Sequence, residues 1–177
     1  MRSKVIAISS VSASLVAIFL TAGAYFSVFD LVSVVIASAF VLLPTYYNSY
    51  GGCILCYLVG GLIAFMFSSF NIMSIVFPAF FAFFGIYPIV RCKMIDKNFN
   101  KATGYIIGLI WCVAVCFGIY FYYTEIMGQP FNDLPEFVLN NILFFVAIAG
   151  VVFYFLFDRF IILSKIMIDK YLGKIIK

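Results

Sequence analysis

The stretch VIAISSVSASLVAIFLTAGAYFSVF at residues 5–29 carries no charged side chain. A membrane-spanning helix needs roughly 20 apolar residues, because the hydrocarbon core of a bilayer is about 30 Å thick. This stretch therefore predicts one crossing of a membrane. Five further, largely apolar runs follow at residues 31–47, 53–67, 72–90, 102–124 and 137–163. Together they predict an all-α, six-transmembrane-helix bundle that forms a single integral membrane domain over residues 1–177. The runs 31–47 and 53–67 are short, so one of them is expected to be irregular or broken.

The composition of the whole chain agrees with a lipid environment. The 177 residues are 66% hydrophobic, 20% aromatic and only 10% charged, whereas soluble domains hold about 25% charged residues. This composition excludes a disordered chain, a nucleic-acid-binding protein and a soluble enzyme. The chain has no histidine, which excludes His-held haem, His-ligated metal sites and His-dependent hydrolysis. We expect no enzyme activity, no catalytic residue, no metal site and no cofactor.

The positions of the charged residues predict the orientation in the membrane. Lys and Arg near helix ends stay in the cytoplasm. Three basic clusters occur, at Arg2 and Lys4, at Arg91, Lys93, Lys97 and Lys101, and at Lys165, Lys170, Lys174 and Lys177. With six crossings, all three fall on one side of the membrane. The opposite side carries Asp30, Glu125, Asp133 and Glu136. We therefore expect an N-in/C-in, multi-pass protein with both termini in the cytoplasm.

The first helix has an alternative interpretation. Arg2 and Lys4 before an apolar run, with Ala22-Gly23-Ala24 after it, also fit a signal peptide. Cleavage there would leave five helices in the same orientation. The apolar run continues to Phe29 and carries a packing pattern, so we expect a retained helix.

Small residues recur four positions apart on three of the predicted helices. The columns are Ser9, Ala13, Ala17 and Thr21; Gly52, Cys56, Gly60, Ala64 and Ser68; and Gly104, Gly108, Cys112 and Cys116. Residues at this spacing share one helix face, where small side chains let two backbones approach. The columns predict close packing. Pro78, Gly85 and Pro88 predict a kink or an unwound turn in the fourth helix.

Two further patterns concern the cysteines and Asp158. Cys53 and Cys56 have the spacing of a redox motif, so a membrane thiol oxidoreductase is one alternative function. The predicted topology places this pair near the reducing cytoplasm, which favours cysteines that act as small apolar residues. Asp158 lies near the inner end of the last helix, and we expect it to meet a basic residue of the segment 91–101, which would lock two helices together.

The outer end gathers most of the remaining polar side chains. The loop 125–136 is the longest outer connection, and polar and aromatic groups above an apolar bundle are typical of a small-molecule site. The alternative is ordinary loop residues with an interfacial aromatic belt, which the tyrosines favour. The candidate solute-binding residues are Asp30, Asn71, Trp111, Tyr122, Tyr123, Glu125, Asn132, Asp133, Glu136, Asn140 and Asn141.

The chain resembles the S components of energy-coupling-factor (ECF) transporters, which are bacterial importers of vitamins and micronutrients. The resemblance lies in the length, the six-helix layout, the small-residue first helix and the passage from Leu43-Pro44 to Gly60-Gly61. It implies a bacterial plasma membrane location and docking of a transmembrane T component on Ser9, Ala13 and Ala17. It also implies two cytoplasmic ABC ATPase subunits as partners and an outward-facing solute pocket.

The resemblance does not name the solute. Nickel and cobalt members carry an N-terminal histidine ligand, whereas residue 2 is Arg2 here. The binding signatures of the thiamine, biotin and riboflavin members have no match among the outer residues. The leading hypothesis is thus a membrane-embedded solute-binding subunit for a vitamin or other small micronutrient. The alternative is a small structural or accessory membrane protein of a larger complex with no solute site.

Overall fold

The computed structural model describes residues 2–69, 74–97, 99–126, 137 and 141–175. Within them, six helices are long and apolar enough to cross a membrane, which confirms the all-α, six-helix prediction. The elements are α1 (Arg2–Tyr25), η1 (Ser27–Phe29), α2 (Asp30–Val41), η2 (Leu43–Tyr47), α3 (Tyr50–Phe67), α4 (Val76–Ala79), η3 (Phe80–Phe84), α5 (Ile86–Asp96), α6 (Lys101–Phe121), η4 (Tyr122–Ile126) and α8 (Ile142–Ile175). The chain is a polytopic membrane protein.

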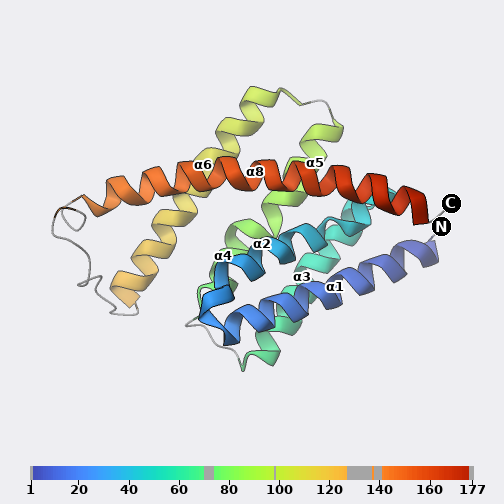
Figure 1. Cartoon of the computed structure of the whole chain (residues 1–177), viewed down its shortest axis with the longest axis horizontal. Helices are drawn as coiled ribbons and strands as arrows, with labels where there is room; N and C mark the ends of the chain where they lie inside the picture. The colour runs from blue at the N-terminus through green and yellow to red at the C-terminus, as the bar shows by residue number, and fades with distance from the viewer. Residues whose placement is uncertain (1, 70–73, 98, 127–136, 138–140, 176–177) are drawn as a thin grey trace.

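The spans alternate in direction between two ends of the bundle. At one end the Tyr50 hydroxyl donates to Asp96, and Lys165 forms an ion pair with the same carboxylate. These contacts join the start of α3, the end of α5 and the later part of α8. At the other end the Tyr25 hydroxyl donates to the Phe67 carbonyl over 3.0 Å, which joins the ends of α1 and α3. Both chain termini lie at the same end of the molecule (Figure 1).

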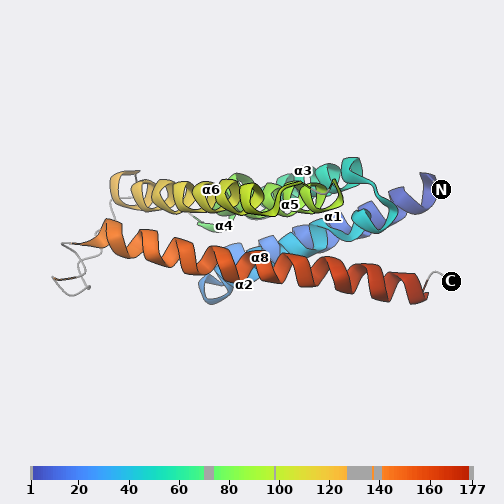
Figure 2. The same cartoon turned by 90° about the horizontal axis from the view of Figure 1, so that it is seen from above.

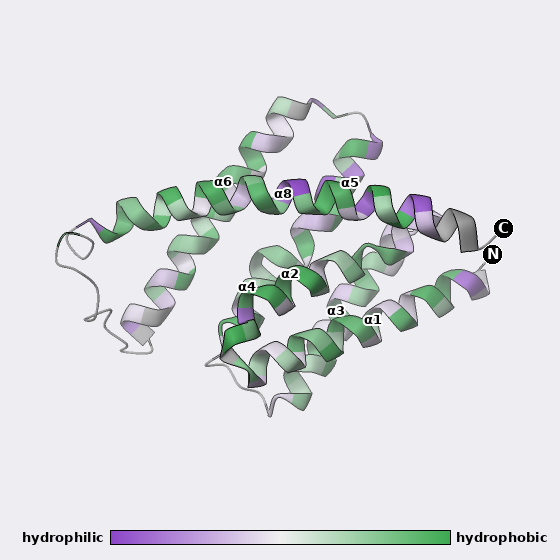
Figure 3. Ribbon diagram, in the orientation of Figure 1, coloured by the Kyte–Doolittle hydropathy of each residue, from purple (hydrophilic) through white to green (hydrophobic). Residues whose placement is uncertain are grey.

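The helices form two layers when the molecule is seen from above. α3, α5 and α6 lie in one layer, and α2 and α8 lie in the other (Figure 2). Hydrophilic colour is concentrated at helix ends, on α5 and in the later part of α8 (Figure 3). Large apolar side chains such as Ile18, Leu62 and Leu156 are exposed on the outer faces of the bundle, as expected for surfaces that contact lipid.

The second span is the irregular one. α2 ends at Val41, and a 3-10 turn with Pro44 near its start continues the crossing to Tyr47. Proline cannot donate a backbone hydrogen bond, so a regular helix ends before it. The Thr45 hydroxyl donates to the Leu42 carbonyl over 2.7 Å, and Asn48 closes the turn at a φ of 52°. α3 continues unbroken from Tyr50 to Phe67, so the predicted irregularity belongs to the second span.

The fourth span contains a π-helix, which confirms the predicted unwound turn. The Gly85 amide donates to the Phe80 carbonyl over 2.8 Å, five residues back. Pro88 follows, where a regular helix would require an amide donor. A Cβ on Gly85 would lie 2.2 Å from the Tyr57 ring, so only glycine allows α3 to pack there. The extra residue in this turn changes the direction in which the Phe80–Phe84 side chains point.

The small-residue columns of α1 and α3 pack against each other, which confirms close packing. A Cβ on Gly60 would lie 2.9 Å from the Ala13 carbonyl oxygen. The Cys56 thiol donates to the Ser9 carbonyl over 3.1 Å.

The last span differs from the range 137–163: α8 begins at Ile142 and extends to Ile175. Its 34 residues rise about 51 Å, so it is longer than the hydrocarbon core.

Candidate functional site

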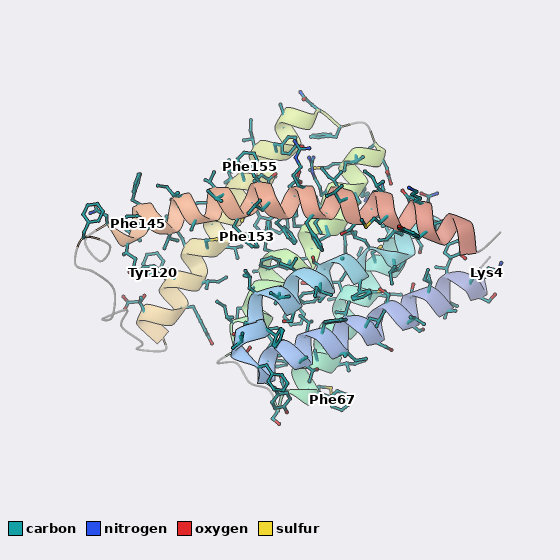
Figure 4. All side chains as sticks on the ribbon, in the orientation of Figure 1. Lys4, Phe67, Tyr120, Phe145, Phe153 and Phe155 are labelled. Atoms are coloured by element: carbon teal, nitrogen blue, oxygen red, sulfur yellow. The ribbon has the colours of Figure 1, made fainter. Side chains whose placement is uncertain are left out.

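An apolar cavity of about 510 Å³ lies between α2, η3, α6 and α8. Its walls come from every one of these elements, at Leu31 and Val34, at Phe83 and Phe84, at Val115 and Ile119, and at Val146 and Phe153. Phe153 and Phe155 leave α8 on opposite sides (Figure 4), so Phe153 reaches the cavity while Phe155 is exposed. The cavity lies toward the end of the bundle where α2 and α8 begin.

Asp30 is the only charged residue in the described lining of this cavity. It occupies the first turn of α2, where a carboxylate is stabilised by the helix dipole. The Ser33 hydroxyl donates to the Asp30 carbonyl over 2.8 Å and secures the backbone of this turn. Among the residues that the structure describes, no side chain forms a hydrogen bond or ion pair with the Asp30 carboxylate. An unpaired carboxylate therefore borders an apolar space.

The aromatic wall of the cavity is held by ring contacts behind it. Phe84 meets Phe153 edge-on with ring centroids 5.6 Å apart. Phe83 stacks on Tyr87 at 4.8 Å and meets Trp111 edge-on at 6.0 Å. The π-helix brings the adjacent Phe83 and Phe84 to the same cavity, although both also contact Phe157 on α8. These contacts fix the two rings, so the wall is formed before any ligand binds.

The predicted solute-binding residues fall into separate groups. Asp30 lines the cavity, and Trp111 packs behind Phe83 without lining it. Tyr122, Tyr123 and the exposed Glu125 lie in the π-helical turn η4 at the end of α6. The Asn141 side-chain amide donates to the Phe137 carbonyl over 3.1 Å at the start of α8. Asn71, Asn132, Asp133, Glu136 and Asn140 lie outside the described residues.

Sequence reasoning missed the aromatic and thiol side chains of the cavity. Phe83, Phe84, Phe153, Cys112 and Cys116 all line it. The signal for the first two was the run FPAFFAFFG at residues 77–85. It contains five phenylalanines, and its proline and glycine mark an irregular helix turn. Phe153 has no comparable signal, because phenylalanines occur throughout the last span.

A buried charge cluster joins α5, α6 and α8 on the far side of Phe83. Arg91 Nε donates to Asp158 Oδ1 over 2.7 Å, and Nη2 donates to Oδ2 over 3.3 Å. The Tyr87 hydroxyl donates to the same Oδ1 over 2.5 Å. The Arg91 guanidinium also lies 4.3 Å from the centre of the Tyr105 ring. The predicted contact of Asp158 with the segment 91–101 is confirmed, and its partner is the helical residue Arg91.

Glycines on α6 provide the space for this cluster. A Cβ on Gly104 would lie 3.0 Å from Arg91 Nη1. A Cβ on Gly108 would lie 2.6 Å from the Tyr154 hydroxyl and 2.7 Å from the Tyr87 ring. Gly104 and Gly108 of the α6 column therefore accommodate large polar side chains, whereas Cys112 of the same column contacts the backbone of α8, with its sulfur 3.7 Å from the Gly150 carbonyl oxygen.

The residues predicted to dock a partner lie along the seam between α1 and α3. Ala13 and Ala17 are 8% and 7% exposed. Two hollows of about 400 and 460 Å³ open along this seam. Ser9 and Ala13 line one, and Ala17 lines the other. The Ser9 hydroxyl is buried and has no hydrogen-bond partner in the described structure.

The five cysteines all lie within the described residues, and each is a free thiol. Cys53 and Cys56 are 0% and 1% exposed, so neither reaches the surface. Among the described residues, no group of three or more His, Cys, Asp or Glu side chains could hold a metal ion.

Comparison with protein-family models, with curated proteins and with solved structures gives no match to this chain.

Proposed function

We propose that this protein is a membrane-embedded solute-binding subunit of the S-component type, which delivers a small micronutrient to an ECF importer. The observation that carries the proposal is the 510 Å³ cavity. Small-molecule sites in proteins are typically apolar cavities of about 300–1,000 Å³ with a few polar groups at defined positions. The aromatic wall and the single carboxylate of Asp30 match this description.

The cavity position also suits uptake from outside the cell. In the proposed N-in/C-in topology, the basic end of the bundle faces the cytoplasm. Asp30 and the start of α8 then face outward, so the cavity lies in the outer half of the membrane. The sequence has no nucleotide-binding loop, so the energy for transport would come from partner ATPases through a T component.

The α1–α3 seam is the surface that we assign to the T component. Its two hollows follow α1 from Val5 to Tyr25, and the small side chains of Ser9, Ala13 and Ala17 are among the residues that line them. Helices approach closely in lipid where such side chains meet. The unpaired Ser9 hydroxyl in one hollow would gain a hydrogen-bond partner from a docked helix.

Co-purification with the T component and the two ATPases tests the assembly. Ala13 and Ala17 support the internal α1–α3 contact, so replacing both by Leu could break the fold as well as docking. We therefore use Ser10→Leu combined with Ser14→Leu. Both serines are exposed, and each lines one hollow. The double variant should fold but lose the partners, and Ala114→Leu on the exposed face of α6 is the matched control.

The result separates the two functions considered. Retention of all partners by the Ser10→Leu, Ser14→Leu variant would contradict docking on this seam. A structural or accessory protein without a solute site predicts a different result. It would tolerate filling of the cavity and would be sensitive only where the small columns pack. Loss of a bound solute on cavity filling, with normal expression, would argue against that alternative.

A further inference from the structure

Resting on the proposed solute-binding function, we infer that the cavity takes an organic cation: a molecule with an apolar body and one protonated amine or quaternary ammonium group. The inference joins two independent observations. The first is the unpaired Asp30 carboxylate at the cavity. The second is the distribution of charge along the whole chain.

Among the described residues, no Lys or Arg pairs with Asp30. Between Lys4 and Arg91 the sequence contains no Lys or Arg, and the same holds between Lys101 and Arg159. Every Lys and Arg therefore falls in or beside the three basic clusters. In the described structure Arg91 pairs with Asp158 and Lys165 pairs with Asp96, both away from the cavity. Since no described Lys or Arg pairs with Asp30, we assign its counter-charge to the ligand.

The surroundings strengthen the preference for a cation. Asp30 is partly buried beside Leu31 and Val34, and a carboxylate in apolar surroundings interacts strongly with an opposite charge. The other acidic residues of the predicted outer segments are Glu125, Asp133 and Glu136, so this part of the chain carries only negative charge. An anionic solute would be repelled, and a neutral one would leave Asp30 unpaired.

The apolar part of the ligand follows from the walls. Phe83, Phe84 and Phe153 present aromatic rings to the same space. Such rings bind aliphatic or aromatic groups by burial of apolar surface, and they also attract a cation placed over a ring face. An amphiphilic cation satisfies both the rings and the carboxylate.

The single tryptophan provides the readout. Trp111 is the only tryptophan of the chain, and it meets Phe83 edge-on at 6.0 Å. A ligand that contacts Phe83 changes the surroundings of the adjacent indole, so binding should change the indole emission of the detergent-purified protein. Three probes of nearly equal shape are phenylbutylamine, phenylbutanol and phenylbutyrate, which carry a positive, a neutral and a negative head group. Excitation at the red edge of the indole band avoids absorption by these phenyl probes.

We expect phenylbutylamine to bind about tenfold more tightly than phenylbutanol, and phenylbutyrate to bind most weakly. Asp30→Asn keeps the side-chain shape and should give the amine and the alcohol equal affinities. Glu125→Gln removes an outer charge that does not line the cavity, and it should leave the preference unchanged. Ala149→Phe should fill the cavity and abolish binding of all probes. The neighbouring exposed Ile148→Phe lies outside the lining and controls for partition into detergent.

The outcomes separate the two proposals. Equal affinities of the amine and the alcohol in the unmodified protein, with loss of both in Ala149→Phe, would overturn the cation preference and leave the solute site intact. An amine preference that persists in Asp30→Asn would also overturn the inference. Probe signals that Ala149→Phe leaves unchanged would contradict the cavity as a binding site and with it the proposed function.

Discussion

Removing one member of the Arg91–Asp158 pair should destabilise the protein more than removing both. The two side chains are 5% and 1% exposed and are joined by contacts of 2.7 and 3.3 Å. In Arg91→Leu the Asp158 carboxylate keeps only the Tyr87 hydroxyl as a partner. An uncompensated buried charge of this kind costs about 3–5 kcal/mol, and Asp158→Leu should cost a similar amount because it strands the guanidinium.

The double variant Arg91→Leu, Asp158→Leu carries no buried charge at this place. Its Tyr87 hydroxyl loses the carboxylate but retains the Tyr154 hydroxyl, 3.2 Å away. A weakened buried hydrogen bond costs about 1–3 kcal/mol at most. The double variant should therefore be more stable than either single variant. The resulting coupling free energy should be about 3 kcal/mol or more in favour of the pair.

Thermal unfolding in detergent measures these differences. For a chain of this size, 1 kcal/mol shifts the Tm by about 2–4 °C, so each single variant should lose about 6–20 °C. Asp96→Asn is the matched control, because it removes the exposed pair with Lys165 and should cost no more than about 1 kcal/mol. Single variants no less stable than Asp96→Asn would refute the reasoning, as would a double variant whose loss equals the sum of the single losses.

Three further predictions concern packing, thiols and topology. Gly108→Ala should lower the Tm, because its Cβ would lie 2.6 Å from the Tyr154 hydroxyl, whereas Gly118→Ala meets open space and should raise the free energy of unfolding by about 0.5–1 kcal/mol; equal Tm changes would contradict the packing. Cys53 and Cys56, at 0% and 1% exposure, should resist a membrane-permeant maleimide in the folded protein and react after denaturation; rapid labelling of the folded protein would show that they are accessible. Reporter tags on the two termini should both be detected in the cytoplasm, and a tag found outside the cell would contradict the N-in/C-in prediction.

The helical architecture followed from local sequence features. Apolar runs of sufficient length marked six spans, because the membrane requires each backbone polar group to be paired within its own helix. Proline and glycine marked the irregular positions for the same reason. The π-helix before Gly85 and the 3-10 turn at Pro44 occur where a backbone donor or a side chain is missing. The segment that contains the partner of Asp158 could also be predicted, because a carboxylate in a membrane helix needs a cation and the segment 91–101 is a basic segment on the same side.

The use of each helix face was harder to predict. The small column of α1 was predicted to dock a partner, and the structure adds that Ala13 of this column lies against Gly60 of α3. The column on α6 has the same spacing, yet its two glycines accommodate Arg91 and two tyrosines, while its two cysteines face Gly150 of α8. Equal spacing thus serves different contacts, because the residue opposite a small side chain comes from a distant part of the chain. For the same reason Asp30 could be named as a polar outer residue, but Phe84 and Phe153 could not be placed beside it.

The sequence by itself determined that this is a six-span membrane protein, and it predicted that the basic segments share one end of the bundle. These properties depend on hydropathy and charge along single helices, which act over a few turns. Only the tertiary structure decided that a cavity lies between parts of α2, η3, α6 and α8, and that Asp30 borders it without a partner among the described residues. A cavity is the space left by side chains from four elements, so its shape depends on crossing angles and on a one-residue shift in the π-helix, which no local pattern records.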